Sequence, residues 1–205
     1  MRIAVLGAGS WGTTLAILLS QNAHDVVLWS HRDDHARAMA EQRENSILLP
    51  GIPIPAAVSI TGDLAFAVKN VEAMVTAVPT QFLRSVAEKL KSAVLEHHLM
   101  VNVAKGIENG SLMTISEILA DVLPHVNQDH IVTLSGPSFA DEVSRRVPTA
   151  VVAASRSIDS ARTTQQVFMT PYFRVYSSTD IHGVELAGSI KNVIAIGAGI
   201  ADGAG

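Results

Sequence analysis

Three glycines follow the first apolar run of the chain at a spacing suited to phosphate binding. Gly7, Gly9 and Gly12 form a Gly-x-Gly-x-x-Gly pattern directly after the strand expected at Ile3–Leu6, and a helical pattern follows. The first glycine permits a tight turn, the second lets the backbone approach a pyrophosphate, and the third lets helix and strand pack closely. Free amides at the helix start favour an anion there. The pattern predicts a dinucleotide site, and the alternative is a tight turn that binds nothing.

The residues that select the ribose of a dinucleotide lie about 20 positions beyond such a turn. An acid there would bond the 2′-hydroxyl of NAD, whereas this chain has Ser30, His31 and Arg32. The fork of the Arg32 guanidinium suits a 2′-phosphate, so we expect NADP(H) as the cofactor with NAD(H) tolerated. Asp33 and Asp34 weaken this preference, and a solvated surface charge at Arg32 is the alternative.

One lysine directly follows a predicted strand. Lys105 comes after the strand expected at Met100–Ala104, and Gly106 lets the chain turn around a ligand. Because parallel strands end at one edge of a sheet, we expect Lys105, Gly136 and Ser138 to gather near the glycine turn. A lysine whose stem only covers the strand end, and a serine that only caps the following helix, are the alternatives.

A second lysine lies in a run of small residues. On a helix, the positions that share a face with Lys191 are Ala187, Gly188, Ala195, Ala198 and Gly199. An ammonium on an apolar helix needs a partner or a function, because burying it alone is costly. An internal ion pair with Glu185 is the alternative. Asn192 adds a donor and an acceptor beside Lys191, so we place both residues in the expected substrate site.

Short β-branched runs alternate with helical segments, which is typical of a parallel sheet covered by helices. We therefore expect an α/β fold with a doubly wound, mostly parallel, Rossmann-like sheet. One helix has an apolar face over Ile115–Leu123 and ends at Pro124. Another aligns Phe82, Val86 and Leu90. The expected strands are Ile3–Leu6, Val26–Trp29, Ala73–Ala77, Met100–Ala104, Ile131–Leu134, Ala150–Ala153 and Phe173–Tyr176.

Two segments depart from this alternation. Leu49–Pro55 contains three prolines, which stop central strands and helices, so we expect a surface loop or an edge segment. From Ile181 to about Ile200 the sequence is helical without a clean apolar stripe, and we expect this helix to be buried on most sides.

The composition excludes several classes of protein. The chain has 205 residues and no cysteine, so it has no disulfide, thiolate metal site or cysteine nucleophile. A pI near 6.0 with only 15 Lys and Arg argues against nucleic acid as a partner. His31 and His35 are four residues apart without an evident third ligand, so we expect no metal site.

The first residues resemble an export signal in having a basic start and an apolar run. Gly7–Thr14 interrupts that run with flexible and polar residues, so we expect neither export nor a membrane span there. We expect no other stretch to be long and apolar enough to span a bilayer, and hence no membrane insertion.

Together these residues resemble the soluble, NAD(P)-dependent glycerol-3-phosphate dehydrogenases of bacteria. The lysine, Ser-Gly-Pro and Lys-Asn segments are specific to that family, whereas the glycine turn is generic. The resemblance spans nearly the whole chain. Its matching stretches are Gly7–Thr13, Val26–Trp29, Lys105–Glu108, Ser135–Ala140, Pro148–Ala150, Phe173–Tyr176 and Gly188–Ala195.

The resemblance implies reduction of dihydroxyacetone phosphate to sn-glycerol 3-phosphate in the cytoplasm, for phospholipid synthesis, by a homodimer when full length. It implies a dinucleotide-binding domain over residues 1–180 and the start of a helical substrate domain over 181–205, so the chain is expected to be an amino-terminal portion. It implies that Lys191 donates and accepts the proton, and we expect Lys191 and Lys105 to be the catalytic residues. The implied dinucleotide contacts are Ser10, Trp11, His31, Arg32, Lys105 and Ala140. The implied substrate contacts are Lys105, Gly136, Ser138 and Lys191.

Two other functions stay open. One is another NAD(P)-dependent dehydrogenase of related architecture that acts on a different small acid or phosphate. The other is a non-catalytic module that binds NAD(P) and signals to a partner. Such a module would explain the glycine turn but not the two lysines.

Overall fold

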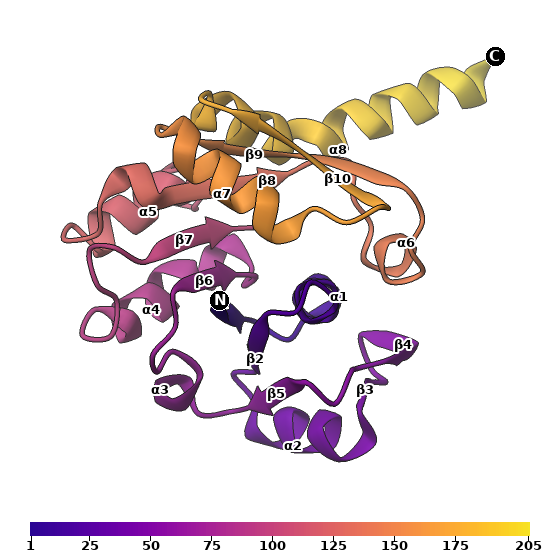
Figure 1. Cartoon of the computed structure of the whole chain (residues 1–205). Helices are drawn as coiled ribbons and strands as arrows, with labels where there is room; N and C mark the ends of the chain where they lie inside the picture. Colours follow the sequence, from indigo (N-terminus) through magenta and orange to yellow (C-terminus); the bar gives the residue numbers. More distant parts are fainter.

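Helices flank a central sheet in the computed structural model, which describes residues 1–205 (Figure 1). The strands are β1 (Arg2–Leu6), β2 (Asp25–Trp29), β3 (Glu44–Asn45), β4 (Leu49–Pro53), β5 (Val58–Thr61), β6 (Ala73–Thr76), β7 (Leu99–Asn102), β8 (Ile131–Ser135), β9 (Thr149–Ser155) and β10 (Phe173–Ser178). The helices are α1 (Ser10–Gln21), α2 (Asp33–Gln42), α3 (Leu64–Ala67), α4 (Thr80–Leu90), α5 (Ile115–Val122), α6 (Ala140–Ser144), α7 (Ile158–Phe168) and α8 (Ile181–Ala204), with a 3-10 turn at Gln128–His130.

The main sheet has eight strands in the order β10-β9-β8-β7-β6-β1-β2-β5. All neighbouring strands in it are parallel except β8 and β9. The chain runs outward from β1 through β2 to β5, then returns to pair β6 on the other side of β1. The predicted doubly wound, mostly parallel sheet is confirmed, and its switch point lies between β1 and β6.

Two apolar cores lie on opposite faces of the sheet. Side chains alternate along β1, so Ile3 and Val5 join one core while Ala4 and Leu6 join the other. The first core is closed mainly by α1 and α7, and the second by α4 and α5. Because both faces are covered, the central strands consist of nearly continuous apolar residues, which made them easy to locate from the sequence. The strand predicted at Phe173–Tyr176 is also present, as the edge strand β10, in which buried and exposed residues alternate.

The sequence patterns missed three short strands at the margin of the sheet, β3, β4 and β5. β5 is an edge strand of four residues, and only Val58 in it is fully buried, so its pattern is too short to stand out. β3 and β4 form a separate two-stranded sheet, and Leu49–Pro53 is thus an edge segment as predicted. In α4, Leu83 packs inward and Phe82 is 63% exposed, so the predicted apolar face was wrong at that residue.

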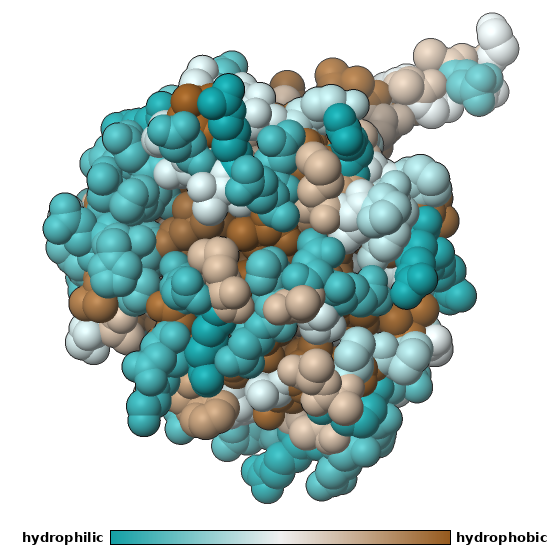
Figure 2. All heavy atoms as spheres, viewed as in Figure 1, coloured by the Kyte–Doolittle hydropathy of each residue, from teal (hydrophilic) through white to brown (hydrophobic).

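Helix α8 differs most from expectation. Only Ile181 and Glu185 in it are buried, so the expectation of burial on most sides was wrong, and its outer half stands clear of the surface (Figure 2).

By length and composition α8 could cross a membrane, since an 18-residue window in it has a mean hydropathy of 1.4. The expectation that no later stretch passes this test was therefore wrong. One such helix is weak support for a membrane span. The exposed large apolar residues of α8 are Leu186, Ile190, Val193, Ile194, Ile196 and Ile200.

A buried carboxylate fixes the inner end of α8. Glu185 is 5% exposed and accepts hydrogen bonds from the backbone and hydroxyl of Ser116, at 2.9 and 2.7 Å, and from the Thr133 hydroxyl at 2.8 Å. Ser116 lies in the first turn of α5, whose free amides favour an anion, and Thr133 lies on β8. Glu185 therefore joins three elements.

We expect Glu185→Ala to lower the free energy of unfolding by about 3 kcal/mol, because it leaves buried donors on Ser116 and Thr133 unpaired. Urea denaturation checks this, with Asp202→Ala, at the exposed end of the same helix, as the control that leaves the midpoint unchanged. An unchanged midpoint for Glu185→Ala would contradict the role of this residue in holding α8.

Candidate functional site

The three glycines of the turn have three different surroundings. Gly7 has φ +118°, and a Cβ on it would lie 2.6 Å from the carbonyl oxygen of Ala77. A Cβ on Gly12 would overlap the carbonyl oxygen of Gly7, whereas a Cβ on Gly9 would meet nothing within 4 Å. Gly7 thus permits the turn, Gly12 permits close packing of α1 on β1, and Gly9 leaves the backbone open to a ligand.

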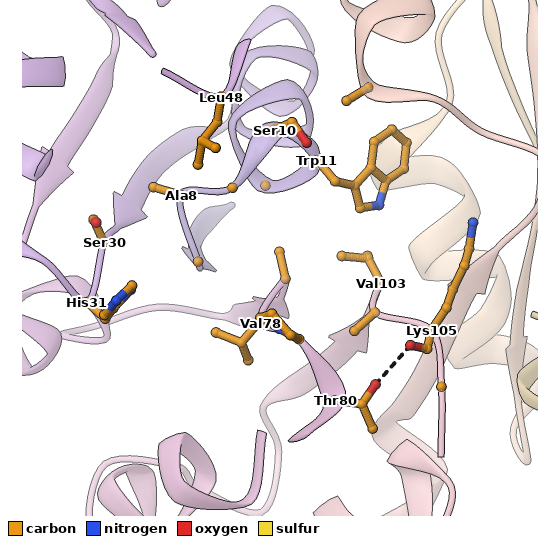
Figure 3. A pocket seen from close by; sticks show the side chains of 18 of the residues that line it. Ala8, Ser10, Trp11, Ser30, His31, Leu48, Val78, Thr80, Val103 and Lys105 are labelled. Carbon is orange, nitrogen blue, oxygen red and sulfur yellow. Dashed lines mark hydrogen bonds between the residues drawn. The ribbon is translucent and has the colours of Figure 1, made fainter. Parts of the chain in front are cut away.

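A cavity of about 810 Å³ opens at the carboxyl ends of the central strands. Ser30 and His31 lie at one end of it, Trp11 and Lys105 lie at the other, and the glycine turn lies between them (Figure 3). The predicted site residues that line this cavity are Gly7, Gly9, Ser10, Trp11, Gly12, His31, Arg32, Lys105, Ser138 and Ala140. The predicted residues outside its lining are Gly136, Lys191 and Asn192.

At the first end, Arg32 is exposed and paired with an acid. Its Nε donates to Oδ1 of Asp34 at 3.2 Å, and this guanidinium holds the pKa of Asp34 below its usual value. The Asp33 carboxylate lies beside Gly62, and Asp33 is not among the residues that line the cavity. An exposed ion pair holds its two side chains together only weakly, so a phosphate can displace Asp34 from the Arg32 guanidinium.

At the other end, the Lys105 amine points inward and does not follow the strand into solvent. Its Nζ donates to the carbonyl of Gly136 at 2.9 Å, and Gly106 has φ +129°, so the predicted turn is confirmed. Burial, followed by the neighbouring charge of Lys191, lowers the pKa of Lys105 from 10.5 to about 8. Lys105 is thus a cation at neutral pH, in surroundings that favour an added negative charge.

Helix α4 holds the loop that carries Lys105. The Thr80 hydroxyl donates to the Lys105 carbonyl at 3.0 Å, as drawn in Figure 3. Arg84 donates to Glu108 at 3.0 Å and lowers the pKa of that carboxyl. These contacts fix the backbone on both sides of Gly106.

Lys191 comes to this end of the cavity from α8. Its Nζ lies 5.4 Å from the ring centroid of Phe139, which lines the cavity, so the contact is of the cation–π type. The helix approaches closely at Gly188, where a Cβ would lie 2.8 Å from Ser135 Oγ. The alternative of an ion pair with Glu185 was wrong, because that carboxylate bonds Ser116 and Thr133 instead.

The other predicted substrate contacts are Ser138, Gly136 and Asn192. Ser138 does not cap a helix, since α6 begins at Ala140, and its hydroxyl donates to the Gly136 carbonyl at 3.4 Å. The Gly136 carbonyl also accepts the bond from Lys105, and its α-carbon packs against β9, where a Cβ would lie 2.9 Å from the Ala150 carbonyl oxygen. Asn192 is exposed on α8.

Sequence reasoning missed several residues of the site. Phe139 is 61% exposed beneath the Lys191 amine, and it could have been found as the aromatic residue of the Ser-Gly-Pro segment. His35 and Leu48 also line the cavity. His35 was considered only as a metal ligand, whereas its nitrogens lie 3.3 Å from Ser30 Oγ and 3.1 Å from Asn45 Oδ1. No periodic pattern points to Asn45, because its bonds join distant parts of the chain.

A doubly wound sheet with an open glycine turn beside its switch point defines a dinucleotide-binding α/β domain of the Rossmann type. A family model described as the N-terminus of NAD-dependent glycerol-3-phosphate dehydrogenase matches residues 2–161, and the model of the C-terminus matches residues 180–205. The chain therefore belongs to the NAD-dependent glycerol-3-phosphate dehydrogenase family.

Relatives and solved structures agree with this assignment. The chain is 51% identical over 205 residues to glycerol-3-phosphate dehydrogenase [NAD(P)+] of Chlorobium luteolum, and 47% identical over 202 residues to that of Lysinibacillus sphaericus. It spans 62% and 60% of their lengths, respectively. The crystal structure of the Coxiella burnetii glycerol-3-phosphate dehydrogenase has a TM-score of 0.90 and 36% identity, over 98% of this chain and 61% of that one.

The glycines provide a matched pair of variants. We expect Gly12→Ala to lower the free energy of unfolding by about 3 kcal/mol or more, because the new Cβ overlaps backbone that cannot move away, whereas Gly9→Ala should change it by less than about 1 kcal/mol. Denaturant titration of both variants checks this. Equal destabilisation would contradict the separate roles given to the two residues.

The pKa of Lys105 should depend on the charge of Lys191. We expect Lys191→Met to raise the pKa of Lys105 above about 8, because removing the neighbouring cation stabilises the protonated form. NMR titration of ¹³C-labelled lysine side chains measures this, with the exposed Lys69→Met as the control. A Lys105 amine that titrates at 10.5 in both proteins would show that the two charges do not interact.

Proposed function

We propose that this chain carries the dinucleotide-binding part of an enzyme that reduces dihydroxyacetone phosphate to sn-glycerol 3-phosphate with NAD(P)H. One observation carries the proposal: the amines of Lys105 and Lys191 meet at the end of the cavity opposite Arg32, and no carboxylate pairs with either. Two unpaired ammonium groups favour a phosphorylated, anionic substrate at that end.

The cavity suits a dinucleotide that lies along it. The open face of Gly9 leaves room for a diphosphate against the amides that begin α1, and Arg32 can meet a phosphate on the ribose. When bound, the reduced nicotinamide supplies a hydride. Trp11 and Lys105 lie at the end where the nicotinamide would be placed.

The lysines then supply charge and a proton. As the substrate carbonyl gains alkoxide character, a nearby ammonium stabilises the negative charge and can transfer a proton to the oxygen. In this proposal Lys191 is the proton donor, and the acceptor in the reverse direction, while Lys105 binds the substrate with the help of Ser138, Asn192 and the backbone of Gly136. A pKa of about 8 keeps Lys105 protonated at neutral pH.

The wider role also belongs to the proposal. We propose that the reaction supplies glycerophospholipid synthesis in the cytoplasm and that the full-length enzyme is a homodimer, on the basis of the family. We also propose that residues 1–180 form the dinucleotide-binding domain and that 181–205 begin a helical substrate domain. The exposed apolar side chains of α8 support the second part, because large apolar surfaces are normally covered in the assembled protein.

Loss of NADPH absorbance after addition of dihydroxyacetone phosphate to a full-length version tests the reaction. We expect Lys191→Ala to lower turnover by about 10²- to 10⁴-fold, because it removes the general acid, while the Kd of NADPH stays within about twofold. Lys69→Ala is the control for loss of a surface lysine.

Equal losses of turnover and NADPH affinity would identify Lys191 as a structural residue. Binding of NADPH without turnover in the unmodified enzyme would favour the non-catalytic, nucleotide-sensing module. Turnover with another small acid or phosphate, but not with dihydroxyacetone phosphate, would favour a different dehydrogenase of this architecture.

A further inference from the structure

A chain of hydrogen bonds links the glycine turn to the residues that follow β2. The side-chain nitrogen of Asn45 donates to the carbonyl of Ala8 at 3.1 Å and to the Thr13 hydroxyl at 2.9 Å. The side-chain oxygen of Asn45 lies 3.1 Å from Nε2 of His35, and Nδ1 of His35 lies 3.3 Å from the Ser30 hydroxyl. These bonds join the glycine turn, α1, β3, α2 and the residue that follows β2.

The direction of these bonds follows from the carbonyl at one end. Because the Ala8 carbonyl can only accept, the Asn45 amide nitrogen must face it, and the Asn45 oxygen is then an acceptor for His35. Nε2 of His35 therefore carries the proton, and in the neutral ring Nδ1 accepts from the Ser30 hydroxyl. The Ser30 oxygen in turn accepts from the backbone N–H of Arg32 at 3.3 Å.

The far end of this chain is the residue expected to meet the ribose phosphate. The Arg32 side chain has only an exposed ion pair with Asp34, which holds it weakly. Its backbone is held by Ser30, which is 2% exposed, and Ser30 is held by His35. The fully buried Asn45 fixes the other side of the His35 ring.

We propose that His35 is a positioning residue that sets the preference for a 2′-phosphate over a 2′-hydroxyl on the bound dinucleotide. This inference rests on the proposed function. His35 orients the Ser30 hydroxyl, and the Ser30 oxygen accepts from the Arg32 backbone N–H. Backbone bonds from Ser30 to Thr61 and from Ala36 to Arg32 also hold this turn, so loss of the ring nitrogens loosens it at the Arg32 N–H without unfolding it. The Arg32 guanidinium is then less well placed for the 2′-phosphate. The 2′-hydroxyl form, which does not need Arg32, is little affected.

The test measures Kd values of NADPH and NADH by titration of the chain. We expect His35→Phe, which keeps the ring shape without nitrogens, to weaken NADPH about fivefold, as for loss of one hydrogen bond, with NADH within about twofold. His35→Gln, which keeps a donor and an acceptor, should return the ratio of the two Kd values toward that of the unmodified protein. Arg37→Ala is the control, because it removes a charge from an exposed position on the same helix.

A double-variant cycle separates positioning from general loosening. In the Arg32→Ala background, His35→Phe should leave the ratio of Kd values unchanged, because the group it positions is gone. Equal weakening of both nucleotides by His35→Phe, or the same shift of the ratio with and without Arg32, would overturn the inference while leaving the proposed function intact. Failure of the unmodified chain to bind either nucleotide would overturn both.

Discussion

The close contact between the carbonyl of Gly7 and the backbone of Gly12 is the constraint on which the cavity depends. At this separation α1 begins directly beyond the end of β1, and its first residues line the cavity together with the loop that follows β6. The strand order reverses at the same place, so the loops after β1 and β6 diverge and leave a cavity that no side chain fills. The ligand-binding region is thus a consequence of backbone packing before any polar side chain contributes.

Much of this arrangement could be predicted from the sequence, because it depends on local patterns. Central strands buried on both faces consist of continuous apolar residues, and the glycine spacing identifies its own turn. The rule that parallel strands end at one edge then brought Lys105 and Ser138 to the glycine turn. The features that were predicted wrongly or missed do not depend on local patterns. The inward face of α4, the start of α6 and the bonds of Glu185 and Asn45 depend on contacts between segments that are distant in the sequence, and no periodicity encodes them.

Glu185 illustrates how such a distant contact places a residue of the site. Its carboxylate accepts hydrogen bonds from the first turn of α5 and from a hydroxyl on β8. These bonds fix the position of α8 along its axis and its rotation about that axis. Gly188, about one turn further along, allows the helix to touch the end of β8. Lys191 then follows at the cavity end beside Lys105. Because the Glu185 carboxylate accepts hydrogen bonds from Ser116 and Thr133, it does not pair with Lys191, six residues later on the same helix.

The ring beneath Lys191 has a consequence for its chemistry. A carboxylate in the place of Phe139 would hold the amine just as well, yet it would also compete for the proton and cancel the field that the amine directs at its surroundings. A benzene ring attracts an ammonium through its quadrupole but has no basic site and no net charge. The protein can therefore orient this cation without neutralising it, so that its charge stays available to whatever molecule enters the cavity.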